Sequence, residues 1–343
     1  MNSFASKERC RPPSLARCNL GRSRLIACSR GLSLGCCAGS LAHAAHARVF
    51  VGAYDIVLEN PIVLAALICF LLGLALSGLV RVVPGSTIAS TVMPIVFLTS
   101  YVLAYQQVPP FPPIGATNKI FYIALAAALI GFVLDLLPQT ANYGKPLAVI
   151  LPLLIVGWIG LPRFAKLDVD LMATSLGLWL GGIALLWRLD SVARTPADLN
   201  GGSIVGTAML MALLLAFAPV AFLGGSSTSL MLCLAAVAGL AAVALWELVV
   251  PRRAFCASAV FGVGCGLLAM IVTVTLITRQ VDLAALALLL LIPYAGEVSA
   301  RFLLPPNRFR GRVRQVLIGT LAASPILLVM AVLLLRHPES FMS

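Results

Sequence analysis

Charged residues are scarce in this sequence: Asp, Glu, Lys and Arg make up 10% of its 343 residues, while 61% are hydrophobic. Soluble globular chains carry about 25% charged and about 45–50% apolar residues. The scarcity of charge excludes a soluble protein and makes the lipid bilayer the solvent. The apolar runs lack the alternation that a barrel needs, so they predict membrane-spanning helices, which satisfy their own backbone hydrogen bonds.

Histidine is nearly absent, and metal-ligand patterns are missing altogether. The three histidines, His43, His46 and His337, lie outside the long apolar runs. Membrane metalloproteases and Ser–His hydrolases therefore lack an essential residue. The sequence also has no CxxC pair and no glycine-rich phosphate loop with a lysine. It predicts no metal and no cofactor, and it disfavours an enzyme, with a lipid-modifying enzyme as the third hypothesis for function.

Acidic residues are half as numerous as basic ones, 12 against 24, which gives a formal charge of +12. Residues 1–50 hold eight basic residues and one acidic residue, so +7 of that charge lies in this arm. The arm offers no folded platform of aromatic side chains for stacking bases, so nucleic acid is not a predicted partner. The predicted partners are the lipid bilayer and anionic lipid head groups.

Residues 1–47 are rich in Arg, Ser and Cys, which is typical of a targeting segment. Three interpretations remain open for this basic N-terminal extension: a cleaved signal peptide, a start codon assigned too far upstream, and a disordered arm. The first two remove the basic arm from the working protein, and we expect it to be absent there. Residues 48–343 are the predicted transmembrane domain.

The rest of the chain predicts an all-α, polytopic integral membrane bundle of about ten transmembrane helices. Most of the apolar runs are about 17–24 residues long, the length that a spanning helix needs. Their connections are short and leave no room for a soluble domain. The expected spans are 61–80, 88–106, 119–137, 146–162, 170–187, 204–223, 228–250, 256–278, 281–304 and 316–335.

The distribution of Lys and Arg between loops predicts the orientation. Loops after the odd-numbered spans carry eleven of these residues, and the opposite set carries five. Five of the eleven lie between the last two spans: Arg301, Arg308, Arg310, Arg312 and Arg314. Basic loops stay in the cytoplasm, so both termini are predicted outside it, in the cell (inner) membrane.

Two glycine pairs stand four residues apart within spans: Gly177 with Gly181, and Gly262 with Gly266. Small residues at this spacing share one helix face and let a second helix approach closely. Each pair is therefore a candidate contact with a partner helix. The alternative interpretation is that glycine is simply frequent in membrane helices.

Three acids lie within the predicted spans: Asp135, Glu247 and Glu297. Ionisable groups in a membrane are costly, so each is a candidate site for a substrate or an ion. Glu297 is the strongest candidate, and Arg301 follows it by one helical turn as an ion-pair partner. The alternative is that Glu297 and Arg301 neutralise each other at the interface, and that Asp135 and Glu247 are interfacial too.

The preferred hypothesis is a small-solute permease, with Glu297 as the coupling acid. Pro219 and Pro293 are its hinge candidates, because a proline within a helix removes a backbone donor and bends it. The alternative is a non-catalytic membrane scaffold or assembly subunit. Its arginine loop would bind an acidic partner or anionic lipid through Arg308, Arg310, Arg312 and Arg314.

Overall fold

The chain separates into two units, Met1–Tyr54 and Asp55–Ser343, and all residues described by the computed structural model belong to the second. These are residues 60–82, 89, 91–137, 143–164, 169–194, 202–249, 255–278, 281, 283–298, 317, 320–321 and 323–336, with the backbone alone for 81–82, 202–203 and 296–298. The extension 1–47 and the arginines Arg301, Arg308, Arg310, Arg312 and Arg314 lie outside the described residues.

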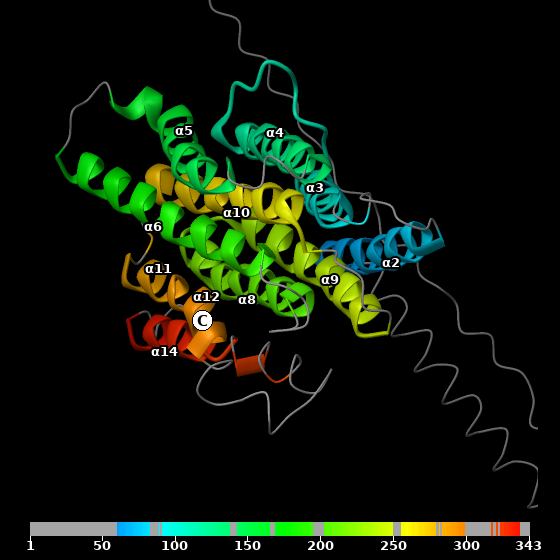
Figure 1. Cartoon of the computed structure of the whole chain (residues 1–343). Coiled ribbons are helices and arrows are strands. Elements are labelled where there is room, and N and C mark those ends of the chain that lie inside the picture. Colours follow the sequence, from blue (N-terminus) through cyan, green and yellow to red (C-terminus); the bar gives the residue numbers. More distant parts are fainter. Residues whose placement is uncertain are drawn as a thin grey trace, which may run out of the picture. The chain divides into compact units, whose positions relative to one another are not determined.

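The described part of the chain is all-helical and contains no strand. Its helices are α2 (Pro61–Val82), α3 (Val92–Tyr105), α4 (Ala116–Leu136), α5 (Gly144–Phe164), α6 (Val169–Arg194), α8 (Gly202–Leu223), α9 (Ser227–Val249), α10 (Ala257–Thr278), α11 (Leu283–Leu289), α12 (Leu291–Val298) and α14 (Pro325–Arg336) (Figure 1). By length and composition α2, α4, α5, α6, α8, α9 and α10 can each cross a membrane, which fits a membrane helix bundle.

Of the ten expected spans, the described residues show seven such helices and three shorter apolar ones, so the count of ten stays a prediction. Helix α3 has 14 residues and α14 has 12. At a rise of 1.5 Å per residue, 14 residues extend about 21 Å, less than the roughly 30 Å hydrocarbon core. The C-terminal end of α3 agrees with the predicted span: the helix ends at Tyr105, and its C-cap Gln106 has a left-handed φ of 52°.

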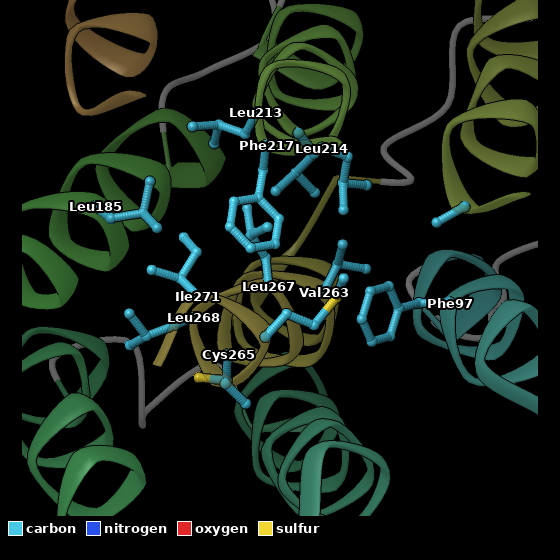
Figure 2. Packing of buried hydrophobic residues seen from close by; sticks show 14 of the residues in the cluster. Phe97, Leu185, Leu213, Leu214, Phe217, Val263, Cys265, Leu267, Leu268 and Ile271 are labelled. Atoms are coloured by element: carbon cyan, nitrogen blue, oxygen red, sulfur yellow. The ribbon is translucent and has the colours of Figure 1, made fainter. Parts of the chain in front are cut away.

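Helix α10 lies at the centre of the described bundle. Its side chains from Ser258 to Leu276 are all buried, and α3, α4, α5, α6 and α8 pack around it. Figure 2 shows Phe97 of α3, Leu185 of α6 and Phe217 of α8 pointing towards it. Because α10 carries no charged residue from Ala257 to Thr278, none of its faces requires water, and the neighbouring helices enclose it.

The relative directions of neighbouring helices follow from contacts at two depths. Gly262 of α10 faces Ala128 of α4, while Gly266 faces Ala124, so these helices are antiparallel. Gly182 of α6 faces Pro152 of α5, and the end of α6 meets the start of α5, which makes that pair antiparallel as well. The ends of α4 and α6 and the starts of α5 and α10 therefore lie at one end of the bundle, which we call the acid end.

Candidate functional site

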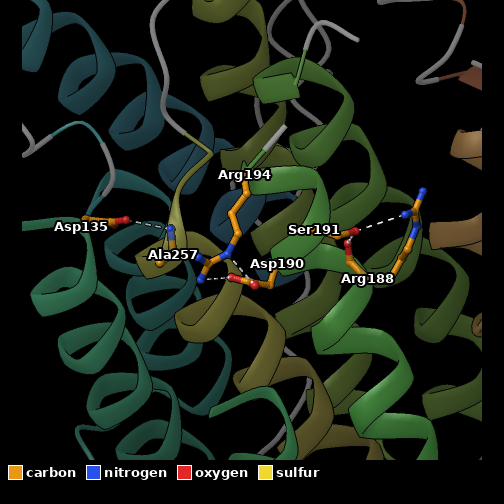
Figure 3. Close-up of polar contacts among 6 residues, drawn as sticks. All are labelled: Asp135, Arg188, Asp190, Ser191, Arg194 and Ala257. Carbon is orange, nitrogen blue, oxygen red and sulfur yellow. Dashed lines mark hydrogen bonds and ion pairs between the residues drawn. The ribbon is translucent and has the colours of Figure 1, made fainter. Parts of the chain in front are cut away.

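Asp135 lies near the end of α4, and its carboxylate binds the start of α10 (Figure 3). It accepts hydrogen bonds from the backbone N–H of Ala257 at 2.9 Å and of Ser258 at 3.0 Å. The first N–H groups of a helix have no acceptor within the helix, and the helix dipole favours a negative charge there. Asp135 is thus a cap for the central helix, and its candidate role in solute binding stays a prediction.

Gly131 allows α4 to approach α10 closely enough for Asp135 to cap it. It precedes Asp135 by four residues on the same face of α4. A Cβ at this position would lie 2.5 Å from the Cα of Ser258 and 2.6 Å from the carbonyl oxygen of Ala257. Only glycine lets the two backbones approach so closely, and that approach brings the carboxylate of Asp135 within reach of the N–H groups of α10.

Glu247 is buried between α8 and α9, with 1% of its surface exposed. The hydroxyl of Thr207, itself fully buried, donates a hydrogen bond of 3.0 Å to its Oε2. Thr207 lies in the first turns of α8, and Glu247 lies in the last turn of α9. A buried carboxylate needs such donors, because desolvation without them is costly.

Asp190 was not predicted as a site from the sequence, in which Arg194 was counted only as a loop charge. Both lie in α6, and Arg194 binds the carboxylate with two nitrogens, Nε at 2.7 Å and Nη2 at 3.0 Å (Figure 3). Asp190 is 3% exposed. The start of α5 lies against this pair, because a Cβ on Gly144 would lie 2.8 Å from Oδ1 of Asp190. The signal in the sequence was the Asp–Arg spacing of four.

The acid end thus repeats one arrangement. In three pairs of antiparallel helices, an acid near the end of one helix lies at the start of the other. The pairs are α4 with α10, α6 with α5, and α9 with α8. Asp135, Asp190 and Glu247 stabilise these contacts between helix ends. None of the three lines either of the two cavities described below.

Glu297 belongs to α12 by its backbone, while its side chain and its predicted partner Arg301 lie outside the described residues. Arg188 of α6 holds the preceding turn of this helix. Its Nε donates to the carbonyl oxygen of Pro293 at 3.3 Å, and its guanidinium lies 5.8 Å from the ring centroid of Tyr294. Arg188 also donates to Ser191 (Figure 3).

The ninth predicted span is broken into α11 and α12. Helix α11 ends at Leu289, Leu290 forms a turn, and α12 begins at Leu291. The ring of a proline clashes with the carbonyl four residues earlier and supplies no N–H to it. For Pro293 that carbonyl belongs to Leu289, the last residue of α11. Pro219, in contrast, lies within the continuous helix α8. Movement at either hinge candidate stays a prediction.

A cavity of about 560 Å³ lies between α6, α8, α10 and α11. Its volume falls within the range of about 300–1,000 Å³ that is usual for small-molecule sites. Figure 2 shows four of its lining residues, Leu185, Leu213, Leu268 and Ile271, around the same space. The full lining is Asp170, Ala173, Thr174, Gly177, Leu178, Gly181, Gly182, Leu185, Leu213, Leu268, Ile271, Leu283, Leu286, Ala287, Leu289 and Leu290.

A smaller cavity of about 250 Å³ adjoins the first, because both are lined by Asp170, Thr174 and Leu283. It adds Thr275 of α10 to the polar groups at this end. These residues lie in the first turns of α6 and α11 and the last turn of α10, far along the helices from the acid end. The polar lining of the large cavity is therefore confined to one end of it.

The glycines of α6 form one wall of the large cavity. A Cβ on Gly177 would meet no atom within 4 Å, and one on Gly181 would meet only Leu290, at 3.4 Å. The other predicted pair is used differently. Gly262 packs against Pro94 and Ala128, and Gly266 against Phe97 and Ala124, all of the same chain.

The chain matches no model of a known protein family, and no curated protein or solved structure is significantly similar to it. Among the described residues, no three His, Cys, Asp or Glu side chains come together in a group that could hold a metal ion. The cavity walled by α6 and α11 has a volume within the range of small-molecule binding sites.

Proposed function

We propose that the protein is a multi-pass membrane permease that binds a small solute in the cavity between α6, α8, α10 and α11. The observation that carries the proposal is that a broken helix forms one wall of the cavity. Leu283, Leu286 and Leu290 of this helix line it, and the break falls at Leu290. Transporters build their binding sites from such discontinuous helices.

The geometry suggests how the cavity would open. Helix α12 is fixed to α6 through Arg188 and the carbonyl of Pro293, so α11 is the half that moves, with Pro293 as its hinge. Pro219 would give similar freedom to α8, which contributes Leu213 to the lining. Glu297, on the fixed half α12, is the proposed coupling acid. With the predicted orientation in the inner membrane, the polar end of the cavity faces the outside.

Cysteine accessibility tests this proposal. Thr174→Cys at the polar end and Leu185→Cys at the inner end are each exposed to a membrane-impermeant maleimide, in right-side-out and in inverted vesicles. A permease alternates its access, so Thr174→Cys should react from the outer side and Leu185→Cys, 2% exposed here, in part from the cytoplasmic side. Pro293→Ala should suppress the second reaction.

Leu267→Cys is the matched control, because Leu267 is fully buried in α10 and does not line the cavity. It should react from neither side, and the chain without an added cysteine sets the background. If Leu185→Cys were as inert as Leu267→Cys from both sides, alternating access would be refuted.

That result would favour the second candidate, a non-catalytic membrane scaffold. The specific observation in its favour is the acid end, where Asp135, Glu247 and Asp190 are all engaged in contacts within the chain. In this candidate function Arg308, Arg310, Arg312 and Arg314 bind an acidic partner or anionic lipid.

A further inference from the structure

The lining of the large cavity changes from polar to apolar along its length. Asp170 and Thr174 lie at one end, with Thr275 in the adjoining space. From Gly177 inwards to Leu185, every lining side chain is apolar. A sugar, an amino acid or an ion would leave its polar groups without partners against this surface, which is unfavourable. The inner part of the cavity suits a hydrocarbon.

The depth of the cavity matches one leaflet of a bilayer. Thr174 and Leu185 are eleven residues apart on α6, about 16 Å along the helix axis. Half of the hydrocarbon core measures about 15 Å. The polar end lies where α6 and α11 begin and α10 ends, which is the depth of the lipid head groups if these helices span the membrane. Polarity in the cavity therefore varies with depth as it does along a lipid molecule.

A second observation points to a ligand at the polar end. The hydroxyl of Thr275 is buried, with 5% of the residue exposed, and it makes no hydrogen bond in the structure. Of the five buried side-chain oxygens without a partner in the described residues, that of Thr275 is the one whose residue lines either cavity. Thr275 lines the smaller cavity beside Thr174, so a head group that forms hydrogen bonds could engage it there after a small rotation of the side chain.

From these three features we infer that the ligand of this cavity is an amphipathic molecule with a hydrocarbon chain and a hydrogen-bonding head group. The chain lies along the glycine wall of α6, and the head group lies at Asp170, Thr174 and Thr275. The inference rests on the proposed function, for which it names the class of substrate.

Gly177 provides a direct test, because it lies midway along the wall and has open space over its Cα. Gly177→Leu would place a side chain in the path of the hydrocarbon, and its Cβ would meet no atom within 4 Å. The matched control is Gly157→Leu on α5, where a Cβ also meets no atom within 4 Å and which lines neither cavity. Thermal unfolding should show both variants to be folded.

The probe is a long-chain alcohol with a photoreactive diazirine in its chain, added to the full-length protein in lipid nanodiscs. Cross-links mapped by mass spectrometry should concentrate on cavity-lining residues of α6 and α11. Gly177→Leu should lower this labelling at least about tenfold, the effect of losing roughly 1.4 kcal/mol of binding, and Gly157→Leu should leave it unchanged. Unlabelled long-chain alcohol should compete, and glucose should not.

Equal labelling of the two leucine variants, or labelling spread over the exposed apolar face of α2, would overturn the inference. The two proposals fail separately. If the cysteines report alternating access but labelling ignores Gly177→Leu, the permease stands and the substrate class is wrong. If labelling follows Gly177→Leu while Leu185→Cys stays inert, the chain binds an amphipath without transporting it.

Discussion

Two glycine pairs with the same spacing serve opposite purposes in this protein. On α10, Gly262 and Gly266 are places where other helices touch: Pro94 and Phe97 of α3 occupy the space that side chains would need. On α6, Gly177 and Gly181 border a cavity of about 560 Å³. The same four-residue spacing thus accompanies close packing in one helix and open space in another.

The difference teaches that a small residue permits close approach without requiring it. What distinguishes the two helices is the set of neighbours around them. Helix α10 lies among α3, α4, α5, α6 and α8, and every side chain from Ser258 to Leu276 is buried. On α6, a Cβ on Gly181 would meet only Leu290 among the described residues, and one on Gly177 would meet no atom within 4 Å.

The largest expected effect comes from filling the packed pair. Leucine at Gly266 would overlap the ring of Phe97, which is 1% exposed and has no room to move, and would approach Ala124. Overpacking a core costs about 1–3 kcal/mol and occasionally more, so we expect Gly266→Leu to lose at least about 3 kcal/mol or to yield no monodisperse protein. Thermal unfolding in detergent measures this.

Gly177→Leu is the counterpart on the cavity side, and it should unfold at or near the wild-type temperature. If the two variants lost equal stability, the space beside Gly177 would be filled by protein and the contrast between α10 and α6 would disappear.

A smaller effect is expected from removing the cap of α10. Asp135→Ala leaves the N–H groups of Ala257 and Ser258 without their acceptor. Caps of this kind contribute about 0.5–2 kcal/mol, so the variant should lose roughly that stability, read from urea or thermal unfolding. Asp135→Asn keeps an acceptor and should lose less.

Asp170→Ala is the matched comparison for Asp135→Ala. Asp170 also lies at the start of a helix, α6, but it is exposed. A surface charge near a helix N-terminus contributes about 0.3–1 kcal/mol, so its loss should cost less than that of Asp135. A larger loss at Asp170 would mean that α6, not α10, is the anchored helix of the bundle.

The sequence was sufficient for the helical membrane class, because long apolar runs with few charges leave no other solution in lipid. It also placed Asp135 within a span as a candidate site, with an interfacial position as the alternative. It could not supply the partner, since the N–H of Ala257 lies 122 residues further along the chain. Contacts of that range are a property of packing and leave no local trace.

The candidate site was less predictable than the fold. Pro293 indicated an interruption, and the helix does break at Leu290. Glu297 and the arginine loop remain sequence-based hypotheses. No feature of the sequence predicted the cavity, because its volume depends on which faces of α6, α8, α10 and α11 remain apart. Gly177 was noticed for its small size, as a candidate contact with a partner helix; that contact stays a prediction, and within the described chain Gly177 borders the cavity.

The smallest expected effect compares two glycines of α6: Gly177, which borders the cavity, and Gly182, which packs against α5 and α10. Gly177→Ala adds a methyl group to open space and removes the conformational freedom of glycine, so it should stabilise the protein by about 0.5–1 kcal/mol. At Gly182 the same methyl would lie 2.8 Å from Leu268 and 2.9 Å from Pro152, so Gly182→Ala should be destabilising. Thermal unfolding of both variants in the same detergent measures the two changes in stability. A loss of stability at both positions would mean that α11 closes onto α6 and that the wall of the cavity is a packed interface after all.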